Sequence, residues 1–167
     1  NLSGVVISTA LAEILTKNKK EMNYSYRFLF IPETIGAITW LSINEKNIEK
    51  IEHGLVLTCL GDKGNFTYKK TRDGNNIIDN IIQKKLIKSN QKHTVKNFFP
   101  TGSDERQFNS PGVEIPMTVL LRSKFGSYPE YHTSLDNFNV VTEKGLTGGY
   151  KFVKKVVSVM QNKIVPI

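Results

Sequence analysis

Residues 53–60 read HGLVLTCL, and this nearly continuous apolar run sets the fold class. A run of this kind is typical of a strand that is buried on both faces, as in parallel sheets covered by helices. Turn residues at 61–64, GDKG, end it. Residues 66–70 then read as a short strand, and residues 75–89 as an amphipathic helix with isoleucines on one side.

The rest of the chain continues this alternation of strands and helices. Further strands are predicted at 26–31 and 117–121, and helices at 2–17, 34–43 and 145–161, with another helical turn or two at 46–51. The pattern predicts a three-layer α/β/α fold around a mostly parallel sheet. The chain begins inside a helix with no strand before it, so we expect the fold to be incomplete at the N-terminus and the chain to be a fragment of a larger protein.

Composition is that of a soluble globular domain: of 167 residues, 39% are hydrophobic and 23% are charged. No apolar stretch is long enough to span a membrane. The first residues lack a basic leader and include Glu13, which argues against an export signal. The single cysteine, Cys59, cannot form an internal disulfide and lies in an apolar run, so we expect a packing role and a cytoplasmic location.

The formal net charge of +8 raises the question of an anionic partner. The lysines, however, are scattered over predicted helix ends and faces, and no basic stripe with interleaved aromatic residues accompanies them. We therefore do not expect this segment to bind nucleic acid.

Glu33 follows Pro32, which ends the predicted strand at 26–31, and directly precedes the predicted helix at 34–43. A carboxylate held and partly shielded at such a junction can have a raised pKa and act as a general base. The alternative is that Glu33 only favours the N-terminus of the following helix. The local sequence leaves both open.

Two long loops hold the other candidates. In the loop at 126–139, His132 could bind zinc, with Asp136 fixing its tautomer, or be an ordinary surface histidine. In the Pro-, Gly- and Ser-rich loop at 98–116, Asp104 could bind a metal, orient a ligand or pair with Arg106. Because ligands of open α/β sheets bind beyond the carboxyl ends of strands, we expect both loops and Glu33 to meet at one edge.

Taken together and in order, four segments resemble the di-zinc aminopeptidase family, which includes glutaminyl cyclases and glutamate carboxypeptidases. They are the Ser3-Gly4 helix, Glu33-Thr34-Ile35-Gly36, Ser103-Asp104 to Phe108 with the following Gly112 to Pro116, and His132-Thr133 to Asp136. The motifs PETIG, GSDERQF, SPG and YHTSLD resemble those of a bacterial aminopeptidase-like subfamily. Members of that subfamily often carry a C-terminal winged helix, and many are linked to surface-polysaccharide gene clusters.

The resemblance implies that residues 1–167 are the C-terminal part of a catalytic domain of a zinc-dependent hydrolase of peptide or amide bonds, holding one or two zinc ions. It implies roles for six residues: Glu33 as general base, His132 and Asp104 as metal ligands, and Arg106, Tyr131 and Asp136 in substrate binding. The expected partner is a peptide or an aminoacyl or amide substrate, and a homo-oligomer stays open.

The chain also departs from the family pattern. The first zinc-binding histidine and the bridging aspartate of the family would lie before Asn1, and Thr34 and Thr58 stand where the family has acids. Two alternatives follow: a catalytically inactive scaffold or binding protein with the peptidase fold, or an amide-processing enzyme of surface-polysaccharide assembly.

Overall fold

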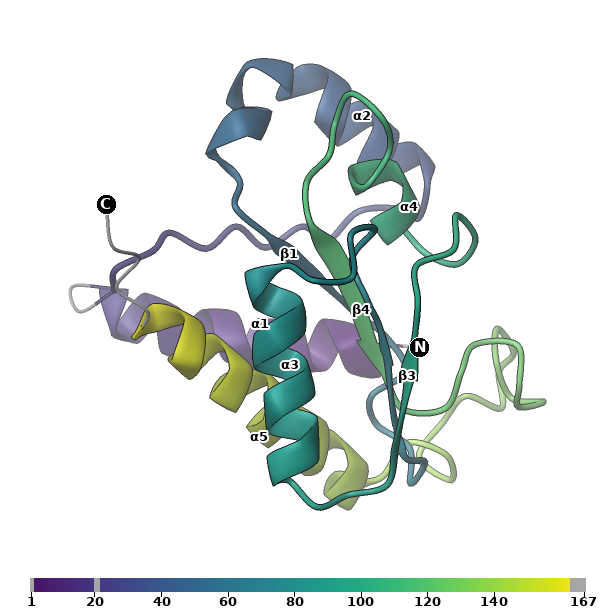
Figure 1. Ribbon diagram of the computed structural model, residues 1–167. Coiled ribbons are helices and arrows are strands. Elements are labelled where there is room, and N and C mark those ends of the chain that lie inside the picture. The colour runs from purple at the N-terminus through teal and green to yellow at the C-terminus, as the bar shows by residue number, and fades with distance from the viewer. Residues whose placement is uncertain (1, 20–21, 163–167) are drawn as a thin grey trace.

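The computed structural model describes residues 2–19 and 22–162. Within them, one four-stranded sheet has the order β1-β4-β2-β3 (Figure 1). Its strands are β1 (Gly54–Leu57), β2 (Phe66–Lys69), β3 (His93–Lys96) and β4 (Met117–Leu121). The β1–β4 and β2–β3 pairs are parallel and the β2–β4 pair is antiparallel, so the prediction of a mostly parallel sheet is confirmed.

The helices follow the sequence pattern closely. They are α1 (Ser3–Lys17), α2 (Ile35–Ile43), the 3-10 helix η2 (Glu45–Lys50), α3 (Ile77–Lys88), the short α4 (Glu105–Phe108) and α5 (Glu143–Gln161). A capping box starts α3: the Asn76 side chain accepts from the Ile78 N–H, and the Asp79 carboxylate accepts from the Asn76 N–H. No helix of the described residues is long and apolar enough to cross a membrane.

Two layers of helices enclose the sheet. Helices α1, α3 and α5 pack on the face that carries Tyr68 and Leu120, whereas α2 and α4 pack near Met117 on the other face. This split follows from the alternation of side chains along β4, all five of whose residues are buried. The α/β/α arrangement predicted from the sequence is therefore confirmed.

The predicted strand at 26–31 is wrong. These residues form no strand in the described structure and run without helix or strand past the β1 side of the sheet (Figure 1). Conversely, β3 was not predicted, because HTVK contains a single apolar residue, Val95, and so has no strand pattern. Strand β1 is also shorter than the predicted run at 53–60, and all four of its residues are only half-buried.

Two glycines allow helices to touch the strand ends. A side-chain carbon at Gly4 of α1 would come within 2.0 Å of the Leu57 carbonyl oxygen, and one at Gly145 of α5 within 2.0 Å of the Gly61 carbonyl oxygen. The buried Ser3 hydroxyl also accepts a hydrogen bond of 2.9 Å from the Leu60 N–H. The residues that follow β1 are therefore held by two helices.

A buried ion pair holds the loop before α4 against the sheet. The Lys69 ammonium at the end of β2 donates hydrogen bonds of 2.6 Å to the carbonyl oxygens of Phe99 and Thr101 and to the Glu105 carboxylate. The Glu105 side chain is fully buried and that of Lys69 is 11% exposed. One cation from the sheet thus organises the loop that carries Asp104.

We predict that Gly145→Ala destabilises the protein more than Gly148→Ala in the same helix. The first methyl group would collide with the backbone at Gly61 and Asp62, whereas the second would closely approach only one side-chain nitrogen, that of Arg122 at 2.6 Å. Overpacking against fixed atoms costs about 1–3 kcal/mol, whereas glycine to alanine inside a helix contributes about 1 kcal/mol of stability. Urea unfolding measures both, and equal free energies of unfolding for the two variants would contradict the close approach.

A second prediction concerns the ion pair. Lys69→Met leaves the Glu105 carboxylate buried without its cation, which should lower the free energy of unfolding by about 3–5 kcal/mol. The matched control is Lys17→Met, which breaks the exposed Glu13–Lys17 pair and should cost no more than about 0.5 kcal/mol. Equal free energies of unfolding for the two variants in thermal and urea unfolding would contradict a buried Lys69–Glu105 ion pair.

Candidate functional site

The turn at Glu33-Thr34 is the strained point of the site. Thr34 has φ 67° and ψ −67°, outside the regions that a β-branched residue readily adopts. The Asp104 carboxylate accepts a hydrogen bond of 2.7 Å from the Thr34 N–H, and the Arg106 guanidinium donates one of 2.7 Å to the Thr34 hydroxyl. Strain of this kind persists where surrounding groups enforce it, and it concentrates at functional sites.

Asp104 and Arg106 thus meet at Thr34. From the sequence, Asp104 could bind a metal, orient a ligand or pair with Arg106. In the structure, one oxygen of its carboxylate accepts a hydrogen bond from the Thr34 N–H, 70 residues away in the sequence. Arg106, expected to bind substrate, holds the hydroxyl of the same threonine. Both side chains therefore position the turn that presents Glu33.

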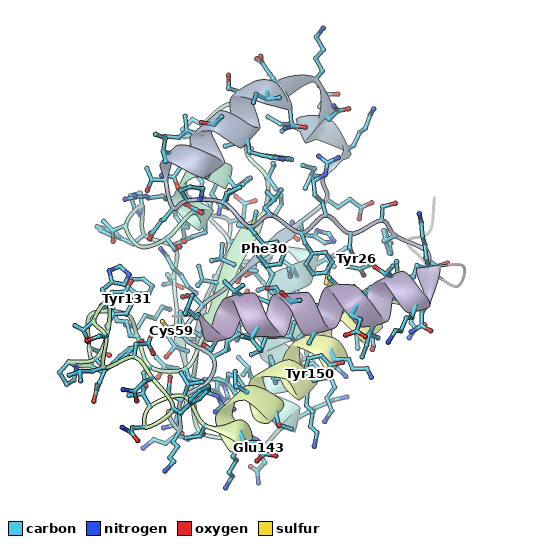
Figure 2. The ribbon with its side chains drawn as sticks, turned by 180° about the vertical axis from the view of Figure 1, so that it is seen from behind. Tyr26, Phe30, Cys59, Tyr131, Glu143 and Tyr150 are labelled. Atoms are coloured by element: carbon cyan, nitrogen blue, oxygen red, sulfur yellow. The ribbon has the colours of Figure 1, made fainter. Side chains whose placement is uncertain are left out.

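The loop after β4 carries two tyrosines that pack on the sheet. The Tyr131 ring packs against the buried cluster of Cys59, Val119 and Leu121, which lies at the carboxyl ends of β1 and β4 (Figure 2). Burial raises the pKa of Tyr131, and electrostatic interactions with Cys59 and Glu33 raise it further. The meeting of Glu33 with the 126–139 loop stays a prediction.

His132 stands beside Tyr131 on this edge. The two rings stack, with centroids 3.9 Å apart and planes 17° from parallel. His132 is exposed and has a φ of 59°, which is uncommon outside glycine. The imidazole is thus presented to solvent from a constrained backbone, a position open to a ligand.

Asp136 lies in the same loop near a second tyrosine. Its charge contributes to the raised pKa of Tyr128, for which burial and the hydrogen bond with Cys59 are the larger causes. The Tyr128 hydroxyl donates to the Cys59 sulfur at 3.4 Å, and the buried Cys59 fills the packing role that the sequence predicted. Asp136 is therefore linked to the rest of this loop by its electrostatic effect on Tyr128.

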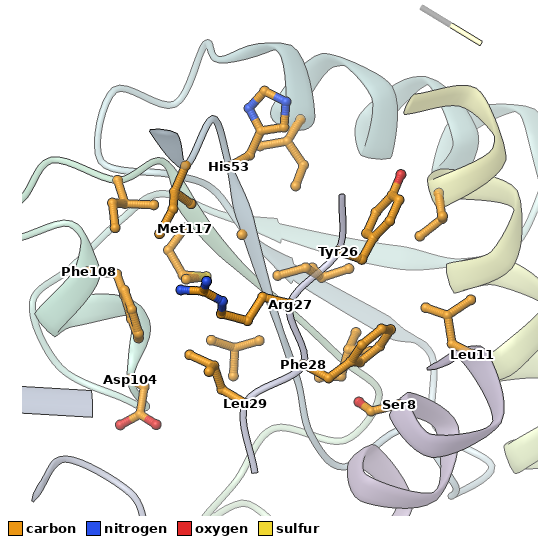
Figure 3. A pocket seen from close by; sticks show the side chains of 18 of the residues that line it. Ser8, Leu11, Tyr26, Arg27, Phe28, Leu29, His53, Asp104, Phe108 and Met117 are labelled. Carbon is orange, nitrogen blue, oxygen red and sulfur yellow. The ribbon is translucent and has the colours of Figure 1, made fainter. Parts of the chain in front are cut away.

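A cavity of about 1270 Å³ opens beside these residues (Figure 3). Residues 23–33 form one side, β1 and its neighbours at 50–58 form the other, and α1 forms the floor. Glu33, Ser103 and Asp104 lie in its lining, which is otherwise mainly apolar. The site therefore joins a charged edge to a large apolar groove.

The family resemblance implies a zinc site, which needs a group of suitable side chains close together. Structural and catalytic zinc sites use at least three protein ligands. In the described part of the chain no three His, Cys, Asp or Glu side chains are grouped closely enough to hold a metal. The described residues therefore do not make a complete zinc site by themselves, and His132 and Asp104 remain predictions as ligands.

Sequence reasoning missed the parts that hold the site together. Nothing local in PETIG marks Thr34 as a residue with positive φ, since threonine is a poor choice there. The Lys69–Glu105 pair joins residues 36 apart and leaves no local signal either. Asp62, read as a turn aspartate, does accept hydrogen bonds from the Gly64 N–H and from Ser123.

Solved structures of other bacterial proteins have a similar fold. A crystal structure of a protein from Clostridium acetobutylicum, named as a peptidase, superposes with a TM-score of 0.92 at 48% identity, covering 97% of this chain and 38% of that one. An aminopeptidase from Aneurinibacillus sp. strain AM-1 gives a TM-score of 0.71 at 18% identity, covering all of this chain and 41% of its own. A zinc aminopeptidase from Bacillus subtilis gives 0.71 at 16% identity, covering 99% and 43%.

Sequence comparison gives a consistent result. A relative in Clostridium acetobutylicum is 48% identical over 162 residues, and it carries the name of a polysaccharide biosynthesis protein with an aminopeptidase-like domain. The match covers 97% of this chain, which spans 37% of the length of that relative. Residues 1–163 match the family described as a domain of unknown function, DUF4910. The chain therefore belongs to the DUF4910 family, and it has the α/β fold of bacterial zinc aminopeptidases.

Proposed function

We propose that the protein to which this domain belongs hydrolyses a peptide or amide bond, with Glu33 as the general base. The observation that carries the proposal is the turn at Thr34, directly after Glu33, which Asp104 and Arg106 hold in a strained conformation. A carboxylate fixed in this way can take a proton from an attacking water and return it to the leaving amine. Fixed geometry lowers the barrier because the reacting groups need no further ordering.

The other residues have supporting roles in this proposal. Asp104 and Arg106 position the Glu33 turn, and Tyr131 and Asp136, from the loop after β4, contact the substrate. His132 is the candidate metal ligand from this chain, and further ligands would have to come from outside the described residues. The substrate is a peptide or an aminoacyl or amide compound.

We predict that Glu33→Gln in the full-length protein lowers kcat for an aminoacyl amide substrate by about 10²–10⁴-fold. The amide cannot accept the proton, but its similar shape should leave folding and metal content unchanged. Glu45→Gln, on the exposed surface of η2, is the matched control and should keep full activity. Wild-type turnover in Glu33→Gln would show that the base is a different group.

An inactive scaffold is the second candidate, and the lack of a three-ligand group among the described residues favours it. Elemental analysis of the purified full-length protein separates the two. A hydrolase should contain about one or two zinc ions per chain and lose activity on chelation, as expected for catalytic zinc. A protein free of metal and inactive on every amide tested would support the scaffold and contradict our proposal.

The name of the Clostridium acetobutylicum relative adds a substrate class to test. A panel of aminoacyl amides and N-acylated sugars, assayed with the same full-length protein, would distinguish a peptidase from an amide-processing enzyme of polysaccharide assembly. A higher kcat/KM for the N-acylated sugars would favour an amide-processing enzyme of polysaccharide assembly, with Glu33 still acting as the general base.

A further inference from the structure

Among the described residues, the β1 edge of the sheet presents backbone groups that no neighbouring strand pairs. The Gly54 N–H donates to the Pro116 carbonyl at 3.0 Å and the Thr58 N–H to the Leu120 carbonyl at 3.5 Å, so alternate residues of β1 face β4. Backbone groups of successive residues in a strand point to opposite sides, so Leu55 and Leu57 face away from β4. The Leu57 carbonyl lies against Gly4, which leaves the Leu55 N–H and carbonyl and the Leu57 N–H at the edge.

A second extended backbone faces this edge across the cavity. Residues 26–31 form no strand, although their sequence, YRFLFI, has the composition of one. They and β1 line opposite sides of the same groove, as Figure 3 shows with Tyr26, Phe28 and Leu29 in front of the sheet. Two strand-like segments are thus separated by a cavity rather than paired.

The walls of the groove are apolar on both sides of the sheet plane. Leu11 and Val153 line it on the side of α1 and α5, and Phe108 and Met117 on the side of α4. The Phe30 side chain at its rim is 55% exposed. Exposed apolar surface of this extent next to an open strand edge marks an interaction site.

The size of the groove suits a single strand. A six-residue strand that takes 4.8 Å of sheet width, about 10 Å of thickness and about 3.3 Å per residue occupies on the order of 1000 Å³. The cavity measures about 1270 Å³. A strand there would meet apolar side chains on both faces, so it must itself be apolar on both faces, as is usual for a parallel strand in the middle of a sheet.

The longer sequence of the Clostridium acetobutylicum relative contains further polypeptide that is a source of such a strand. This chain matches the Clostridium acetobutylicum protein along 97% of its own length but spans only 37% of that protein. We infer that the groove receives one apolar β-strand, parallel to β1, from polypeptide corresponding to the unmatched part of the relative. The strand would pair with Leu55 and Leu57 on one side and with residues 26–31 on the other. This inference does not depend on catalysis.

Amide hydrogen exchange measured residue by residue by NMR tests it directly. In the isolated 167-residue chain, the Leu55 amide at the open edge should exchange at least about tenfold faster than the Val56 amide, which faces β4. Overlapping 12-residue peptides that cover the unmatched part of the relative are then added one at a time. One apolar peptide should bind and slow exchange at Leu55 by at least about tenfold, with little change at Val56.

Charged variants provide the control. Phe30→Asp places a charge at the rim of the groove and should abolish binding, whereas Phe138→Asp, at a position 89% exposed in the loop after β4, should not. Three results would overturn the inference: no peptide binds, a peptide binds without protecting Leu55, or protection at Leu55 rises with the concentration of the chain alone. The last result would make a second copy the occupant.

Discussion

The hydrogen bond from the Thr34 N–H to the Asp104 carboxylate is the constraint on which the site depends. It joins the connection before α2 to the loop before α4, two segments that no strand pairing brings together. The bond is charge-assisted, and such bonds are roughly twice as strong as neutral ones. It therefore offsets a backbone conformation at Thr34 that costs on the order of 1–3 kcal/mol.

Asp104 can do this only because its own loop is fixed. Lys69 draws two carbonyl oxygens and the Glu105 carboxylate to the end of β2, and Glu105 is the residue after Asp104. Removing such a buried cation costs more than the pair contributes, because the carboxylate would be left desolvated. The position of the Glu33 turn thus follows from a lysine in the sheet, through the Lys69–Glu105 ion pair and the Thr34–Asp104 hydrogen bond.

Much of the fold could be predicted from the sequence because its signals are local. The pattern gave β4 with the bounds 117–121, and the helical spacing gave α1, α3 and α5 to within a few residues. The strand expected at 26–31 failed for a physical reason: strand formation needs a backbone partner, and the described chain places none beside it. The site was predictable only as a set of loops near one edge. The residues that hold those loops, Thr34 and Lys69, are defined by contacts between distant segments.

The central claim is that Asp104 fixes the turn that presents Glu33. The most direct measurement is the pH titration of the Thr34 amide proton by NMR, in wild type and in Asp104→Asn. An amide proton that donates to a carboxylate should shift as that carboxylate is protonated, and the shift should vanish in the variant, whose side chain does not titrate. A Thr34 amide that responds identically in the two proteins would contradict the account.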